Sequence, residues 1–283
     1  MTAIARPSVA RRQGSWFRPI YLLILAWCVG VLGPYLWMFI TSITPPNELA
    51  TMGLFPENPT LQAFPSLIQD TPFLIYLTNS IQVAMGTVLL TVACALLAGT
   101  ALSRYRFRGR RVVLGGVLVM QLFPAILLIV PLYIELKALG LIDNKFGLIL
   151  IHTTFALSFS TWLIKGFVDQ IPIEIEEAAY ADGCNRWQAF WYIILPLSRP
   201  GITAAAVYAF IYSWNEFLFA LTFTFGPDTR TLPVGLSLFV GENTIRWDFL
   251  TAAGVLAAIP ILIGFMYAQK GLIAGLSSGA VKG

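Results

Sequence analysis

Residues 171–201 read IPIEIEEAAYADGCNRWQAFWYIILPLSRPG and separate two long apolar stretches of the chain. The segment opens with Pro172, which suits the first turn of a helix because its missing N–H needs no partner there. Three glutamates follow at once, and their negative charge complements the dipole at a helix N-terminus. We therefore expect a short helix from about Pro172 to Ala181.

Gly183 can end that helix in a sharp turn, because a residue without Cβ adopts the left-handed conformation at little cost. A second helix is expected from near Asn185, with its apolar side chains three and four residues apart on one stripe. The stripe consists of Trp187, Phe190, Trp191 and Ile194. By itself such a stripe indicates an amphipathic helix resting on a membrane surface. We expect Pro196 and Pro200 to end this unit.

The composition of the whole chain is that of a membrane protein. Its 283 residues are 57% hydrophobic and 11% charged, whereas about a quarter of the residues of soluble domains are charged. A membrane span needs roughly 20 mostly apolar residues whose backbone polar groups are paired within the segment. Six stretches meet this test and lack the alternation of a β-barrel, so we expect an all-α membrane protein with six transmembrane helices. They are residues 21–43, 75–102, 112–136, 146–167, 202–225 and 249–268.

The basic residues predict the orientation of these spans, because lysine and arginine favour the cytoplasmic side. With the N-terminus inside, all but four of the 18 basic residues fall on that side. Residues 1–18 then form a cytoplasmic segment, and residues 19–283 form a single transmembrane domain. Both termini and the loop 169–200 are expected in the cytoplasm. The five arginines within 104–111 are explained by a stop signal between two spans, and a separate docking role for them stays open.

The chain offers little to bind a nucleotide, a metal or a nucleic acid. No lysine follows a glycine, so the phosphate-binding G-x-x-x-x-G-K-[ST] loop is absent and we expect no cofactor in this chain. The three cysteines form no Cys-x-x-Cys pair, and no metal site is expected. The one histidine, His152, is explained more simply as a packed, hydrogen-bonded imidazole than as a metal ligand or base. A membrane-embedded enzyme would need clustered acids, histidines or a nucleophile at one depth, and the sequence lacks such a cluster. The net charge of +4 is accounted for by topology and contact with anionic lipid, so no nucleic-acid partner is expected.

Glu216 is a carboxylate within a span, where an ionised side chain costs roughly 2.5 to 3.5 kcal/mol on insertion scales. Such a group faces either a water-filled path or other protein groups. With Asn215, Tyr212 and Tyr208 it offers hydrogen bonds and aromatic faces that suit a polyhydroxylated ligand, and Gln121 is a further candidate. The alternative is a structural role, in which Glu216 bonds to neighbouring helices or to a freed backbone group. Its use as a proton-linked group would instead make the chain an ion-gradient-driven sugar transporter.

The spacing within residues 171–201 resembles the coupling loop of ABC importer permeases. That pattern is Glu-Ala-Ala, three residues, Gly, nine residues, Ile, any residue, Leu-Pro. Here it is filled without insertion or deletion by Glu177, Ala178, Ala179, Gly183, Ile193, Leu195 and Pro196. Further matches, from about Tyr21 to the end, resemble carbohydrate importers of the maltose-permease type, and the smaller second permease of such pairs is the closer likeness. They are Asn79-Ser80, Phe123-Pro124, Pro131-Leu132, Leu139-Gly140-Leu141, Trp214-Asn215-Glu216-Phe217 and residues 279–283.

The resemblance implies the fold of a type I ABC importer permease that forms half of the translocation path for a carbohydrate. The cargo would be an oligosaccharide, a disaccharide or a related polyol phosphate. The implied partners are a second homologous permease, a cytoplasmic ATPase dimer that holds ATP and Mg²⁺, an extracytoplasmic sugar-binding protein, and the lipid of a bacterial or archaeal plasma membrane. The residues expected to couple to the ATPase are Glu174, Glu177, Ala178, Ala179, Asp182, Gly183, Leu195 and Pro196. Cys184 departs from the family, in which a smaller residue is more familiar.

Overall fold

The computed structural model describes residues 17–51, 53–241 and 245–280, and every long element in these ranges is a helix. Most of the expected N-terminal segment 1–18 lies outside them. The long helices are α1 (Phe17–Ser42), α3 (Phe73–Arg104), α6 (Lys145–Val168), α10 (Arg199–Asn215) and α13 (Trp247–Ala280). The shorter ones are α2 (Ala63–Asp70), α4 (Arg110–Leu122), η1 (Ala125–Leu128), α5 (Ile129–Ala138), α7 (Ile173–Ala181), α8 (Arg186–Ala189), η2 (Phe190–Ile194), α9 (Leu195–Leu197), α11 (Leu218–Phe223) and α12 (Leu232–Ser237).

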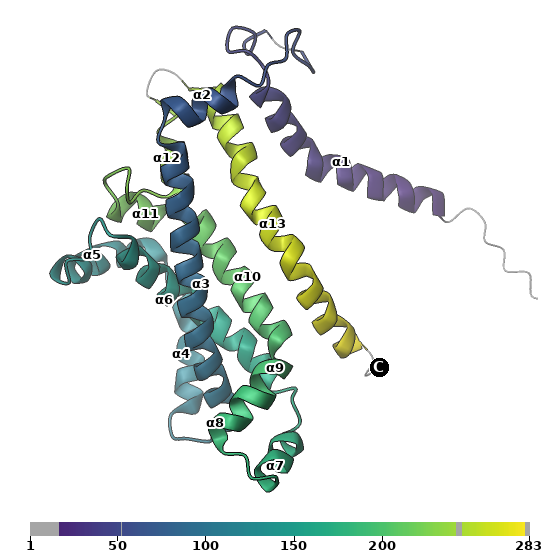
Figure 1. Cartoon of the computed structure of the whole chain (residues 1–283), viewed down its shortest axis with the longest axis vertical. Helices are drawn as coiled ribbons and strands as arrows, with labels where there is room; N and C mark the ends of the chain where they lie inside the picture. Colours follow the sequence, from purple (N-terminus) through teal and green to yellow (C-terminus); the bar gives the residue numbers. More distant parts are fainter. Residues whose placement is uncertain (1–16, 52, 242–244, 281–283) are drawn as a thin grey trace, which may run out of the picture.

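Helices α3, α6 and α10 pack side by side and form the core of the molecule (Figure 1). The close approach of α3 to α6 depends on Gly99, because a Cβ there would lie 3.0 Å from the backbone N of Lys165. Small residues at such contacts let membrane helices pack their backbones closely. An inner cluster of buried side chains lies at the end of the bundle near α8. It consists of Ala95, Leu96, Ile164, Val168, Phe190, Ile194 and Ala205.

At the opposite end of the bundle, α3 holds the segment between α11 and α12 on two polar side chains. Asn79 Nδ2 donates to the carbonyl oxygens of Pro227 at 3.0 Å and Arg230 at 2.9 Å. The Oγ of Ser80 accepts a hydrogen bond from Leu232 N at 2.7 Å. This outer loop is therefore seated directly on the N-terminal part of α3.

Four helices are long and apolar enough to cross a membrane unbroken, and two bent pairs raise the number to six if each pair is one span. The unbroken ones, α1, α3, α6 and α13, match the expected spans 21–43, 75–102, 146–167 and 249–268. The stretch 112–136 is bent by 101° between α4 and the η1–α5 unit. Phe123 is extended at the bend (φ −78°, ψ 127°), because a residue before proline disfavours the helical conformation.

The stretch 202–225 is divided in a way the sequence analysis did not predict. Helix α10 ends at Asn215, and Glu216 is extended (φ −69°, ψ 127°) before α11 begins at Leu218. No proline or glycine lies at this break. The physical reason is a side-chain one, because the carboxylate of Glu216 binds the first free N–H groups of α11, as described below.

The loop unit ends between Pro196 and Pro200, the two prolines expected to end it. Helix α9 carries the helical path past Pro196 without a break. The chain bends by 72° only between Leu197 and Arg199, where α10 begins. Pro200 then lies in the first turn of α10.

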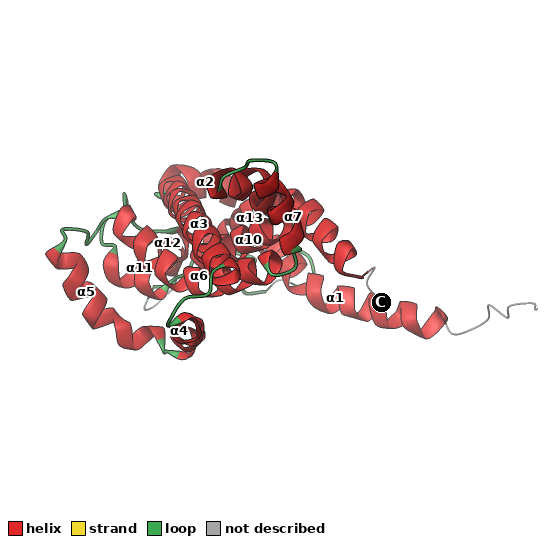
Figure 2. Cartoon of the chain, turned by 90° about the horizontal axis from the view of Figure 1, so that it is seen from below, coloured by secondary structure: helices red, strands yellow, loops and turns green. Residues whose placement is uncertain are grey.

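Helix α1 stands apart from the bundle and diverges from it along its length (Figures 1 and 2). Its C-terminal part packs against α13, where an added Cβ on Gly254 would lie 2.7 Å from Met38 Sδ. Along Ile20–Ser42, only Thr41 and Ser42 at the C-terminal end are buried within this chain. An apolar helix in this position requires lipid or another protein chain as its surroundings.

Candidate functional site

Helix α7 is the short helix expected from the sequence. It begins at Ile173, after an extended Pro172 (φ −57°, ψ 134°), and Glu174 and Glu176 occupy its first turn. At the other end Gly183 has φ 91°, a left-handed conformation that is unfavourable for a residue with a Cβ. An added Cβ at Gly183 would meet no atom within 4 Å, so the backbone conformation alone requires glycine here.

The turn at Gly183 also satisfies the last carbonyl groups of α7. Gly183 N donates to Tyr180 O at 3.1 Å, and Cys184 N donates to Ala179 O at 2.9 Å. This is the hydrogen-bond pattern of a glycine C-cap, which reverses the chain directly after a helix.

The second helix begins where the sequence predicts. Asn185 Oδ1 accepts from Gln188 N at 2.9 Å, and Gln188 Oε1 accepts from Asn185 N at 2.7 Å, which is a capping box. Helix α8 continues into the π-helical turn η2. The aromatic stripe is divided, because Phe190 is buried in the inner cluster whereas Trp187 and Trp191 are exposed.

The residues expected to couple to the ATPase do not all lie together in the structure. The exposed side of α7 carries most of them, with Ala179 half-buried at its margin. We define the coupling surface as Glu174, Glu177, Ala178, Ala179, Asp182 and Gly183. Leu195 and Pro196 are half-buried in the η2–α9 segment, and Leu195 packs against the inner cluster instead.

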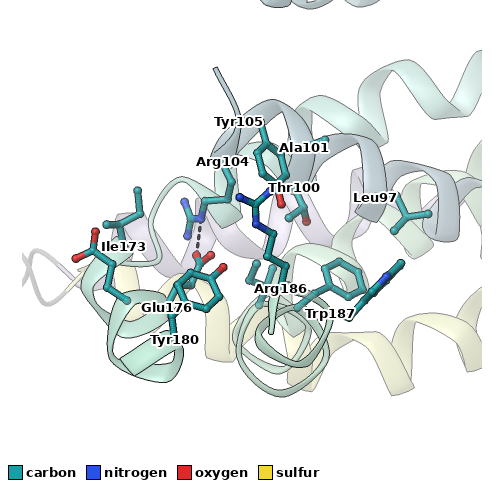
Figure 3. Close-up of a pocket in the computed structure, with 13 residues that line it drawn as sticks. Leu97, Thr100, Ala101, Arg104, Tyr105, Ile173, Glu176, Tyr180, Arg186 and Trp187 are labelled. Atoms are coloured by element: carbon teal, nitrogen blue, oxygen red, sulfur yellow. Dashed lines mark hydrogen bonds and ion pairs between the residues drawn. The ribbon is translucent and has the colours of Figure 1, made fainter. Parts of the chain in front are cut away.

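Glu176, next to the coupling surface, is turned inward and joins α7 to the end of α3. Its Oε1 lies 2.5 Å from Nε of Arg104, and the two side chains are only 6% and 11% exposed (Figure 3). Arg104 Nη2 also donates to the carbonyl of Ile171 at 2.9 Å. A guanidinium that binds both a carboxylate and a backbone carbonyl fixes the position of the segment it holds. Movement of α7 is therefore linked directly to α3.

A cavity of about 670 Å³ lies beside this ion pair, between the C-terminal end of α3, α7 and the α8–η2 segment (Figure 3). Arg186 reaches across it, with its guanidinium carbon 5.5 Å from the ring centroid of Tyr105. Because this space separates α7 from the bundle, the Arg104–Glu176 pair is the main polar connection between them in the described part of the chain.

Neither Arg104 nor Glu176 was singled out by the sequence. The sequence explains Arg104 as part of a stop signal and Glu176 by the helix dipole, and neither explanation calls for a partner residue. The two are separated by 72 residues, so no local spacing could have paired them.

A second polar group lies inside the bundle and joins α3, α6, α10 and α11. His152 is fully buried, with Nδ1 2.8 Å from Ser213 Oγ and Nε2 3.1 Å from Glu216 Oε2. Ser213 Oγ continues to Thr87 Oγ1 at 3.4 Å. His152 thus has polar partners on both ring nitrogens, and no three His, Cys, Asp or Glu side chains gather as a metal site within the described residues.

The carboxylate of Glu216 also accepts hydrogen bonds from backbone N–H groups at the break between α10 and α11. Its Oε1 accepts from Phe219 N at 2.8 Å, and its Oε2 accepts from Ala220 N at 3.0 Å. These are donors that the start of a helix leaves unpaired. Both carboxylate oxygens are therefore engaged within the chain.

The remaining path candidates lie on two helices. Tyr208 and Tyr212 are half-buried on α10, with ring centroids 6.4 Å apart, and Tyr212 stands edge-on to the His152 ring. Asn215 is exposed and donates to Ile211 O at 2.8 Å. Gln121 is exposed near the end of α4, next to Met120, whose Sδ lies 4.0 Å from Ser158 Oγ of α6. Tyr208 and Tyr212 thus lie on one face of α10, Tyr212 and Glu216 both lie next to His152, and Gln121 belongs to another helix.

The chain is similar to known transport proteins. The family described as binding-protein-dependent transport system inner membrane component matches residues 91–277. The sulfoquinovosyl glycerol transport system permease protein SmoH of Agrobacterium fabrum is 35% identical over 257 residues, which cover 90% of each chain. The trehalose transport system permease protein SugB of Mycobacterium tuberculosis is 33% identical over 274 residues, which cover 96% of this chain and 99% of that protein.

A solved structure shares the fold. It is the crystal structure of a bacterial ABC transporter involved in the import of the acidic polysaccharide alginate, with a TM-score of 0.78 and 23% identity over 91% of this chain and 98% of that one. The expected type of membrane fold is thereby confirmed. The family match covers well over half of the chain and confirms the resemblance first seen in the loop: this chain belongs to the inner-membrane components of binding-protein-dependent transport systems.

Proposed function

We propose that this chain is the permease subunit of an ATP-driven importer of a carbohydrate, with the coupling surface of α7 as the docking site of a cytoplasmic ATPase. The observation that carries the proposal is the division of α7 into two sides. One side, from Glu174 to Gly183, is exposed and thin because of its alanines, which lets another protein approach closely. The other side is tied to α3 through Glu176 and Arg104.

The mechanism we infer is alternating access driven from outside this chain. ATP and Mg²⁺ would be held by the ATPase, since the permease has no phosphate-binding loop of its own. Closure of the ATPase dimer would displace α7, and the Arg104–Glu176 pair would pass that displacement to α3 and the bundle. The coupling loop and both termini would then lie in the cytoplasm.

The proposal includes a second, homologous permease and an external sugar-binding protein. Support for the second permease comes from α1, where no side chain from Ile20 to Ile40 is buried within this chain. One permease would then supply half of the path. The outer loop seated on Asn79 and Ser80 would be the natural contact for a protein that delivers sugar, because it lies at the end of the bundle away from α7.

A carbohydrate cargo is supported by the names of relatives, which transport sulfoquinovosyl glycerol and trehalose. Within this chain, Tyr208, Tyr212 and Asn215 offer aromatic faces and amide groups to a sugar in the path, and Gln121 is a further candidate. We assign Glu216 first to the α10–α11 break, since its oxygens already accept two backbone bonds.

The docking assignment is tested by a bulky residue on the coupling surface. In Ala178→Trp the ring would prevent close approach, so the ATPase should no longer copurify and sugar uptake by membrane vesicles should fall by more than tenfold. Ala138→Trp, at the exposed end of α5 on the opposite side of the bundle, is the matched control and should keep both activities. If ATPase association and uptake survive in Ala178→Trp, α7 is not the docking element.

A further inference from the structure

The turn between α3 and α4 forms a small, strongly basic hollow that the proposed function does not use. Its volume is about 530 Å³. The residues that line it are Arg106, Phe107, Arg108, Gly109, Arg110, Arg111 and Val112. No carboxylate lies within 4.0 Å of any of these four guanidinium groups in the part of the chain that the structure describes. The hollow therefore carries a concentrated positive charge, and the acidic group that interacts with it electrostatically is Asp169, through Arg110.

The backbone of the turn has a defined shape. Gly109 takes φ 89°, and Arg110 N donates to Phe107 O at 3.3 Å. Arg110 Nε donates to the carbonyl of Leu102 at 2.7 Å, which ties the turn back to α3. Arg110 thus holds the turn in place, and Arg106, Arg108 and Arg111 remain to receive a ligand.

The position of the turn indicates the surface of a bilayer. Helix α3 has 32 residues and is about 48 Å long, against about 30 Å for the hydrocarbon core. Its last residue, Arg104, lies at the same end of the bundle as α7. Helix α4 leaves the turn at the edge of the bundle (Figure 2). It has no buried residue, and Val112 and Val113 in its first turn are exposed.

We infer that this turn binds the headgroup of an anionic phospholipid, with the acyl chains along the exposed start of α4. Guanidinium forks match the oxygens of a phosphodiester, and basic clusters next to a span attract anionic lipids. The apolar wall of Val112, Val113 and the half-exposed Phe107 suits a lipid better than a soluble protein. The inference rests on the proposed function in one respect only: that function places the bound lipid in the membrane leaflet that faces the ATPase.

The inference can be tested on the assembled transporter in detergent by native mass spectrometry with added dioleoyl phosphatidylglycerol. Dioleoyl phosphatidylcholine provides the neutral headgroup and inorganic phosphate the free anion. The parent should bind phosphatidylglycerol saturably and phosphatidylcholine at least tenfold more weakly. Removal of three arginines, in R106Q/R108Q/R111Q, should weaken phosphatidylglycerol binding on the order of 100-fold at low salt, at about fivefold per arginine.

Two controls keep the result decisive. R106K/R108K/R111K preserves the charges that set topology and should lose less than tenfold, and R199Q, exposed near the start of α10, should lose no more than about fivefold. Affinity within threefold of the parent in the glutamine variant would overturn the inference, as would equal binding of phosphatidylcholine. Full displacement of lipid by inorganic phosphate would assign a simple anion site.

Other outcomes separate this inference from the proposed function. If the glutamine variant binds lipid normally but releases the ATPase, the turn is a protein-docking surface and the lipid assignment is wrong. A permease that carries Ala178→Trp should lose uptake and still bind phosphatidylglycerol. Loss of lipid binding in that variant would contradict a site confined to the arginine turn.

Discussion

At the scale of single residues, two neighbouring glutamates of α7 have opposite environments. A helix turns by about 100° per residue, so Glu176 and Glu177 cannot face the same way. Glu176 is 5% exposed and paired with Arg104, whereas Glu177 is exposed and has no ion-pair partner among the described residues. One therefore belongs to the interior of the chain, and the other is available to a partner.

Glu176→Gln should destabilise the permease far more than Glu177→Gln. Removing one member of a buried ion pair leaves the other charge uncompensated, at a cost of about 3 to 5 kcal/mol. A surface change stays within about 0.5 kcal/mol. Thermal unfolding of the purified permease measures both, and Arg104→Met with Glu176→Leu should recover part of the loss. Equal melting temperatures for the two glutamine variants would show that the pair has no structural role.

Gly183→Ala should destabilise the turn after α7 by about 1 to 2 kcal/mol, because φ is 91° there and a Cβ is unfavourable in the left-handed region. Asn tolerates this region better, so Gly183→Asn should cost less. Gly166→Ala, in the last turn of α6 with no atom within 4 Å of the added Cβ, is the matched control and should be neutral or stabilising. Melting temperatures and ATPase copurification give the readout. A loss in Gly166→Ala as large as in Gly183→Ala would contradict the conformational explanation.

Asp143 should make the outer end of the molecule sensitive to acid. Its carboxylate accepts from Phe225 N at 2.8 Å and from the Thr229 hydroxyl, and these bonds hold the pKa of Asp143 below its ordinary value. A lowered folded-state pKa contributes stability above the unfolded-state pKa, and this stability is lost as the pH falls through the folded-state pKa. The melting temperature of the parent should exceed that of Asp143→Asn at pH 7, and the difference should shrink below about pH 4. A constant difference would exclude this titration.

At the scale of elements, the two broken spans differ in how far the sequence predicts them. The bend after α4 follows from Pro124, which has no N–H and restricts the residue before it. The break after α10 has no such signal in Asn215-Glu216-Phe217. It depends on a carboxylate that competes for the N–H groups of Phe219 and Ala220 and is itself held by His152. Only the assembled bundle brings these groups together.

Glu216→Leu should destabilise the α10–α11 break, because it leaves two N–H groups and His152 Nε2 without an acceptor. Each unsatisfied buried donor costs about 1 to 3 kcal/mol. Glu216→Gln keeps one acceptor oxygen and should lie between the parent and the leucine variant in thermal unfolding. Asn215→Ala is the neighbouring control and should change stability little, since Asn215 is exposed. If Asn215→Ala lowers sugar uptake without changing stability, the Asn215 amide belongs to the path. An unchanged melting temperature in Glu216→Leu would refute the structural role of the Glu216 carboxylate.

At the scale of the whole molecule, the sequence predicts the helical class, the position of the spans and the two-helix loop. It does not predict which side chains meet across the bundle. Hydrophobic runs show that α1 is a span, but nothing in residues 21–43 indicates that this helix leaves the bundle. That arrangement depends on packing against α13 and on surroundings that lie outside this chain.

A photoreactive amino acid in place of Leu25 should cross-link α1 to the second permease. Leu25 is 60% exposed on the N-terminal part of α1, where the chain itself buries no side chain, so a partner is expected to pack there. The same amino acid in place of Leu67, which is fully buried, should give no intermolecular product. Mass spectrometry of the cross-linked transporter identifies the partner. Cross-links from position 25 to lipid alone would show that α1 is not an interface.

Helix α3 has a fixed attachment near each of its ends: Arg104 to α7 on one side, and Asn79 with Ser80 to the outer loop on the other. The rise of an α-helix places Asn79 about 37 Å from Arg104. A helix held in this way acts as a lever, and a tilt of about 5° would shift Asn79 by about 3 Å relative to Arg104. A displacement of α7 would then be passed along α3 to the outer loop at the other end of the bundle.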